Sequence, residues 1–124
     1  MQITSLLGPN IEDQLKQRYQ SDNLVTAHFL KKYLELIHYL RSTGPEPKVY
    51  VMQLGEELWF SQTGGGIAKV WVDWYAYAPL DDGQPVTHYR IHYQPRNSQL
   101  SRDIRRPTVE EAEAAILRAF EESA

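Results

Sequence analysis

Polar and apolar residues alternate most regularly between residues 68 and 94. From Ala68 to Ala78 the even-numbered positions are apolar, and in the following run Tyr89, Ile91 and Tyr93 alternate with polar side chains. A period of two is typical of strands with one buried face. The Asp-Gly pair between the two runs favours a tight turn. The pattern therefore predicts an antiparallel hairpin around which the rest of the chain is arranged.

The register of this hairpin follows if Asp82 and Gly83 are its two loop residues. Trp74 then faces Ile91 on the apolar side. A slip of one residue would exchange the two faces, so the pattern determines which side chains share a face. On the other side, Asp73 would face His92, Tyr75 would face Arg90 and Tyr77 would face His88. The predicted polar-aromatic face holds seven side chains: Trp71, Asp73, Tyr75, Tyr77, His88, Arg90 and His92.

Two further strands are predicted at Lys48–Leu54 and Glu57–Gln62, joined by Gly55-Glu56 in a II′ turn. Both strands carry apolar residues on both faces, a pattern typical of strands buried on two sides. The glycine-rich segment 63–66 then leads into the hairpin. If this segment preserves the alternation, Trp59 joins the helix side and Phe60 the open side, but three glycines leave that assignment open.

Three stretches have helical patterns. Asn10 is a candidate N-cap for residues 11–20, and residues 24–41 repeat apolar positions at helical spacing. Thr108 followed by Glu111 is a capping box for the last helix, and residues 95–106 read as irregular. The predicted fold is a single α+β domain over residues 1–124. It has a four-stranded antiparallel meander with a long N-terminal helix and a C-terminal helix packed on one face.

Composition narrows the classes of protein. The chain has 124 residues, no cysteine and a net charge of −3, which excludes disulfides and thiolate metal sites and disfavours a general polyanion binder. The start of the chain lacks a basic region and a long apolar run, so we expect no signal peptide. No stretch has the length of a membrane span. These features predict a cytoplasmic protein with no membrane partner.

Candidate chemistry centres on the histidines of the hairpin. Asp73 could orient His92 as a general base, but Asp–His is also an ordinary cross-strand pair, and no activated nucleophile lies nearby in the sequence. His88 and His92 have a spacing compatible with a metal, yet two histidines and one aspartate form an incomplete ligand set. We therefore expect no catalytic residue, no metal site and no cofactor. His28 falls on the polar side of its helix and His38 on its flank, and both are expected to be solvated.

The aromatic side chains of the polar-aromatic face admit two interpretations. Trp, Tyr and Arg side chains form stacking platforms for bases or sugars, and they also dominate protein–protein interfaces. The order of helix, strands and helix is similar to that of a double-stranded RNA-binding domain. However, that family depends on a lysine-rich start to its last helix, where this chain has Glu110, Glu111 and Glu113. Carboxylates repel phosphates, so we expect no nucleic-acid partner and assign no family.

The sequence thus predicts a non-enzymatic accessory or adaptor protein with a protein partner or a homo-oligomeric assembly. Binding would use the polar-aromatic face together with arginines of the following segment, Arg102, Arg105 and Arg106, which would steer an acidic partner. The alternative is a small-molecule-binding domain or small enzyme, with a pocket between helix and sheet lined by Trp74, Tyr89 and Tyr93.

Overall fold

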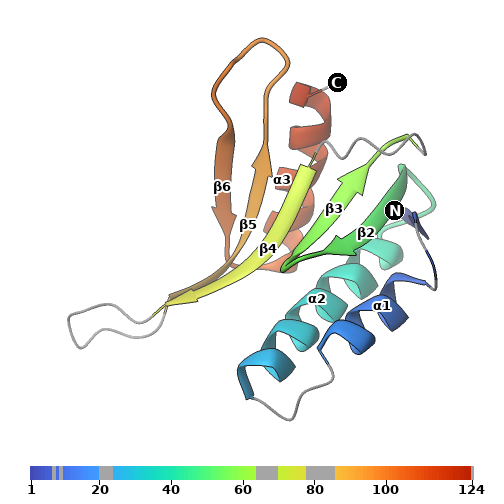
Figure 1. Cartoon of the computed structure of the whole chain (residues 1–124). Helices are drawn as coiled ribbons and strands as arrows, with labels where there is room; N and C mark the ends of the chain where they lie inside the picture. The colour runs from blue at the N-terminus through green and yellow to red at the C-terminus, as the bar shows by residue number, and fades with distance from the viewer. Residues whose placement is uncertain (7, 9, 20–23, 64–69, 78–85, 124) are drawn as a thin grey trace.

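One sheet and one layer of helices are formed by the segments whose patterns have period two and period 3.6 (Figure 1). The computed structural model describes residues 1–124 except 7, 9, 20–23, 64–69, 78–85 and 124. Its elements, in chain order, are β1 (Gln2–Ser5), α1 (Ile11–Arg18), α2 (Leu24–Ser42), β2 (Lys48–Leu54), β3 (Glu57–Ser61), β4 (Val70–Tyr77), β5 (Val86–Tyr93), β6 (Arg102–Arg106) and α3 (Val109–Ser123).

The six strands lie in the order β1-β2-β3-β4-β5-β6. Strands β2 to β6 form an antiparallel meander, while β1 runs parallel to β2 and is joined to it through α1 and α2. The α+β class is confirmed, but the prediction of a four-stranded, purely antiparallel sheet is wrong. Both missed strands are short edge strands, and β6 reads Arg-Asp-Ile-Arg-Arg. Charged edges resist further strand pairing and show little hydrophobic alternation.

Local capping chemistry sets the starts of two helices. The Asn10 side chain accepts a hydrogen bond from the Asp13 amide at 2.9 Å and starts α1. The Thr108 hydroxyl accepts from the Glu111 amide at 3.2 Å and donates to the Glu111 carboxylate at 2.9 Å, so the predicted capping box is present at α3. The helix α1 ends at Arg18, two residues before the predicted end.

No helix within the described ranges is long and apolar enough to cross a membrane.

The core lies between the helix layer and one face of the sheet. Helix α2 contacts both α1 and α3, and α3 packs on β5 and β6 (Figure 1). The buried side chains at the centre of this core come from α2, the four central strands and α3: Tyr33, Leu36, Ile37, Leu40, Val51, Leu58, Phe60, Val72, Trp74, Tyr89, Ile91, Tyr93, Ile116 and Phe120.

The predicted hairpin is confirmed as β4 and β5, but its register differs from the prediction by two residues. Trp74 pairs with Tyr89 instead of Ile91, and Asp73 pairs with Arg90 instead of His92. A shift of two residues leaves every side chain on its original face, so alternation alone could not distinguish the two registers. The observed register places an Asp and an Arg directly opposite each other. The predicted Asp82-Gly83 turn lies outside the described residues.

The conditional assignment of β3 is also wrong. Phe60 pairs with Val70 and is fully buried on the helix side, whereas Trp59 pairs with Trp71 on the opposite face. Along β2 and β3 the residues facing away from the helices are mostly half-buried, so these strands have one fully buried face instead of the two predicted. The turn between them has Gly55 at φ +60°, as a II′ turn requires at that position.

Candidate functional site

The sheet face opposite the helices carries the polar and aromatic side chains, and we call it the open face. Within the described part of the chain, all three helices pack on the other side of the sheet. The open face is built by strands β3 to β6, whose pleat turns every second residue outward. Its described side chains include Glu57, Trp59, Trp71, Asp73, Tyr75, His88, Arg90, His92, Asp103 and Arg105.

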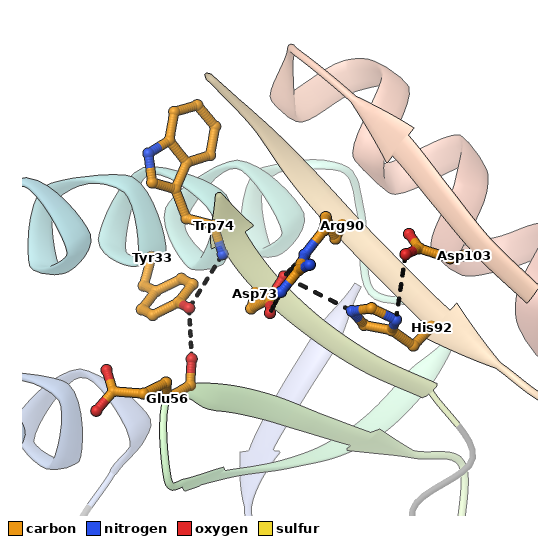
Figure 2. A network of polar contacts seen from close by, with 7 residues as sticks. All are labelled: Tyr33, Glu56, Asp73, Trp74, Arg90, His92 and Asp103. Atoms are coloured by element: carbon orange, nitrogen blue, oxygen red, sulfur yellow. Dashed lines mark hydrogen bonds and ion pairs between the residues drawn. The ribbon is translucent and has the colours of Figure 1, made fainter. Parts of the chain in front are cut away.

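Asp73 and Arg90 form the centre of the open face (Figure 2). The Arg90 Nε donates to Asp73 Oδ1 at 2.9 Å and its Nη2 donates to Oδ2 at 2.6 Å. The Asp73 side chain is only 12% exposed, so this two-bond pair is partly shielded from water. Burial acts to raise the pKa of Asp73, but the contacts of His92 and Arg90 outweigh it and hold the pKa below its usual value.

His92 lies between two carboxylates. Its Nε2 is 3.7 Å from Asp73 Oδ1, and its Nδ1 is 3.9 Å from Asp103 Oδ2 on β6 (Figure 2). The contact with Asp73 raises the pKa of the His92 imidazole above its usual value, against the effect of burial. The raised pKa reflects the ion pairing of His92 with the carboxylates on either side of its ring.

Aromatic rings flank this polar centre. The Arg90 guanidinium lies over the Tyr75 ring, 4.6 Å from its centroid, and Tyr75 also packs on His88 at 5.3 Å. On the other side, Trp59 and Trp71 meet edge to face at 5.7 Å. Burial, followed by the charges of Arg105 and Arg90, lowers the pKa of His88, which favours a neutral ring. The open face therefore combines aromatic surface with a charged pair, a composition found at interface hot spots.

Six of the residues that the sequence predicted for this face lie together on it: Trp71, Asp73, Tyr75, His88, Arg90 and His92. Tyr77 belongs to β4 and pairs with Val86, but its side chain is outside the described residues. The predicted arginines separate, because β6 is a strand and not the irregular segment expected. Arg105 lies on the open face opposite Arg90, while Arg102 and Arg106 lie on the helix side of β6.

Sequence reasoning missed three residues of the open face. Glu57 and Trp59 come from β3, whose facing could not be inferred across the glycine-rich segment, and Asp103 comes from the unpredicted strand β6. Alternation along β3 shows that Glu57, Trp59 and Ser61 share one face. It does not show whether that face is the open one. Glu57, Asp73 and His92 each offer one atom within 4.8 Å of the other two, so this set could hold a metal ion.

A buried hydroxyl positions β4 behind the open face. Tyr33 of α2 donates to the Glu56 carbonyl at 2.6 Å and accepts from the Trp74 amide at 3.1 Å (Figure 2). The β3–β4 ladder ends at the pair Leu58 and Val72, because the chain before Glu57 is already in the β2–β3 turn. Trp74 therefore has no strand partner on the β3 side. The hydroxyl takes the place of the missing strand partner and satisfies the buried Trp74 amide together with the part-buried Glu56 carbonyl.

The three residues proposed to line a pocket lie inside the core. Trp74, Tyr89 and Tyr93 are 4%, 1% and 0% exposed, and the Tyr89 hydroxyl donates to the Lys32 carbonyl at 2.9 Å. Trp74 and Tyr89 pack edge to face at 4.6 Å. A ligand between helix and sheet would have to separate these side chains, so the small-molecule alternative stays a prediction that requires the core to open.

No protein-family model, no curated protein and no solved structure matches this chain.

Proposed function

We propose that this chain is a non-enzymatic accessory protein that binds another protein through its open face. The observation that supports this proposal is the position of Trp59, Trp71, Tyr75 and Arg90 on the sheet face away from the described helices. Large aromatic residues and arginine are the side chains that contribute most to protein–protein affinity when a partner covers them. A surface that leaves such aromatic side chains exposed to water also lowers the solubility of a protein.

The rigidity of the face supports a preorganised interface. Tyr75 is packed between Arg90 and His88, and Arg90 is held by two hydrogen bonds to Asp73. A side chain that is already ordered loses little conformational entropy on binding, which leaves more of its contact energy available for affinity. The centre of the interface is thus expected at Tyr75 and Arg90, with the two Trp residues beside it.

Arg105 gives the proposed interface a basic rim. It is exposed on the edge strand β6, on the same face as Arg90. A rim charge changes mainly the association rate and its salt dependence. We expect an acidic partner surface on this side. Arg106 is the adjacent residue of the same type but lies on the helix side, so it provides a matched control for any effect of Arg105.

Site-specific photo-crosslinking tests the proposal in a lysate of the source organism. A photoreactive phenylalanine analogue at position 71 should give a discrete protein adduct, and the same analogue at the helix position Tyr39 should not. The adduct at position 71 should disappear when Tyr75 is also replaced by Ala. Circular dichroism of each variant checks that the fold is retained.

Binding of the captured protein then gives the quantitative test. Tyr75→Ala should weaken binding by about 2 kcal/mol or more, roughly 30-fold, mainly through faster dissociation. Arg105→Glu should slow association and flatten its dependence on salt, whereas Arg106→Glu should leave both near the wild-type values. Equal adducts from positions 71 and 39, or wild-type affinity in Tyr75→Ala, would contradict the proposed interface.

A further inference from the structure

Three neighbouring strands place metal-ligand side chains at one point of the open face. Glu57 comes from β3, Asp73 from β4 and His92 from β5, and their potential ligand atoms all lie within 4.8 Å of one another. The three strands are hydrogen-bonded neighbours in the middle of the sheet, so the backbone positions of these residues are fixed by the ladder. Sites built on strands hold ligands more firmly than sites on loops.

Two of these residues have charged neighbours where the outer partners of metal ligands usually lie. A ligating histidine normally gives its second ring nitrogen to a carboxylate or a carbonyl, and a ligating carboxylate is itself hydrogen-bonded. Here the Asp103 carboxylate lies 3.9 Å from His92 Nδ1, on the other side of the ring from Asp73, whose Oδ1 is 3.7 Å from Nε2. Arg90 holds Asp73 through both of its oxygens. This arrangement distinguishes the set from an ordinary group of surface acids.

The charge balance of the set also favours a cation. The carboxylates of Glu57, Asp73 and Asp103 gather around His92 and face the single guanidinium of Arg90, so carboxylates outnumber the guanidinium three to one. A divalent ion neutralises that excess. Arg105, on the same face of β6, lies opposite Arg90 and adds positive charge at the edge of the set.

We propose that Glu57, Asp73 and His92 bind a divalent transition-metal ion, with Zn²⁺ preferred, on the open face. One imidazole nitrogen and two carboxylate oxygens are ligands that Zn²⁺ accepts, whereas Mg²⁺ and Ca²⁺ prefer oxygen alone. Three protein ligands leave one coordination position of a tetrahedral ion open. This inference stands on the ligand geometry and does not depend on the proposed protein partner.

Binding of one ion requires the ligand atoms, now within 4.8 Å of one another, to move closer together. With metal–ligand bonds of about 2.0–2.2 Å, two ligand atoms of one tetrahedron lie roughly 3.3 Å apart. His92 Nε2 and Asp73 Oδ1 are already 3.7 Å apart. Glu57 has the longest side chain of the three and is half-buried, so it can approach by rotation about its own bonds. Each Asp73 oxygen retains a lone pair beside its bond to Arg90, so the guanidinium need not leave.

Calorimetric titration of the chelator-treated protein with ZnCl₂ at neutral pH tests the proposal. We expect one ion per chain, weaker binding of Mn²⁺, and no comparable heat with Mg²⁺ or Ca²⁺. Histidine ¹H–¹⁵N spectra provide a site-specific measurement. Zn²⁺ should shift the Nε2 resonance of His92 while the ring resonances of His28 and His38, exposed on α2, stay in place.

Matched variants assign the ligands. Glu57→Gln and His92→Gln should each lower Zn²⁺ affinity at least tenfold, and Asp103→Asn should lower it about tenfold by removing the outer partner of His92. His38→Gln should bind as the wild type does. Thermal unfolding of the metal-free variants verifies folding, and Glu57→Gln alters a half-buried side chain outside the hydrophobic core.

Two results would overturn the metal site. One is Zn²⁺ affinity in Glu57→Gln and His92→Gln equal to that of the wild type. The other is a zinc-induced shift that appears at His28 or His38 and not at His92. In either case the set would be an ion-pair network that only orders the open face.

Discussion

Individual aromatic residues of the hairpin have different structural roles according to the face on which they lie. Trp74 is 4% exposed and packs against Tyr89 and under the Lys32 ammonium, 4.9 Å from its ring. Trp71, three residues earlier, is half-buried on the open face and contacts Trp59. Burial therefore assigns one tryptophan to the stability of the fold and leaves the other available to a partner.

Replacement of these two tryptophans should give unequal losses of stability. Trp74→Ala removes a buried aromatic side chain and should lower the free energy of unfolding by about 3–5 kcal/mol. Trp71→Ala leaves a shallow surface depression, so its effect should be clearly smaller. Urea denaturation of both variants measures the difference. Equal losses would mean that the open face is as closely packed as the core.

Tyr33 makes a second prediction at this scale, because its hydroxyl replaces a missing strand bond. Tyr33→Phe keeps the ring in the core but leaves the Glu56 carbonyl and the Trp74 amide without that partner. We expect a loss of about 1–3 kcal/mol in the free energy of unfolding, the usual cost of buried polar groups without partners. Tyr50→Phe, on a half-buried strand position, is the control and should change little. If Tyr33→Phe left the free energy of unfolding unchanged, water would have to replace both hydrogen bonds.

At the scale of elements, helix α3 begins at a cap that was visible in the sequence. Thr108→Ala removes the acceptor for the Glu111 amide, and the free energy of unfolding should fall by about 1 kcal/mol. Thr108→Ser retains the hydroxyl and should restore most of that loss. Chemical denaturation of the two variants provides the comparison. If Thr108→Ala and the wild type unfold at the same denaturant concentration, the helix start is held by its packing and not by the cap.

Strand β6 shows how an edge can belong to the sheet and still resist aggregation. Four of its five residues are charged, and Ile104, opposite Ile91, is its one apolar side chain on the helix side. Charged side chains on an exposed edge discourage pairing with another chain. The same feature hid the strand from pattern analysis, because its single apolar residue creates no alternation.

At the scale of the whole molecule, Glu122 near the end of α3 connects the helix layer to the sheet edge. Its carboxylate accepts a hydrogen bond from the Tyr93 hydroxyl of β5 and lies 3.4 Å from Arg102 of β6 and 3.0 Å from Arg118. The bond from Tyr93, followed by that from Arg118, lowers the pKa of Glu122 below its ordinary value. Because the folded state favours the charged form, this carboxylate stabilises the fold once it is ionised.

The pH dependence of stability tests that connection. A carboxylate with a lowered folded-state pKa contributes stability above its unfolded value of about 4.3, and the contribution is lost as the pH falls through the folded value. Wild type should therefore be more stable than Glu122→Gln at neutral pH, and the difference should shrink below about pH 4. The adjacent exposed Glu121→Gln should show no such trend in thermal unfolding. A difference that is constant with pH would assign the effect to packing.

The sequence alone determined which side chains of the hairpin share a face and where most elements begin. The alternation from Val70 to Trp74 placed Trp74 in the core and Asp73 on the open face, as the structure has them. The strand bounds Lys48–Leu54 and the caps at Asn10 and Thr108 were likewise readable. These features depend on local chemistry, that is, the pleat, the period of the helix and the first free amides of a helix.

Only the tertiary structure decided the pairing between segments. The register that opposes Asp73 to Arg90, the placement of β3 that brings Glu57 to His92, and the edge strands β1 and β6 all depend on contacts between distant residues. A shift of the register by two residues leaves the alternation within each strand unchanged. A charged edge strand has no alternation of apolar and polar residues. The polar centre of the open face is therefore a product of strand pairing, because the free energies that select a register come from cross-strand contacts that no single segment contains.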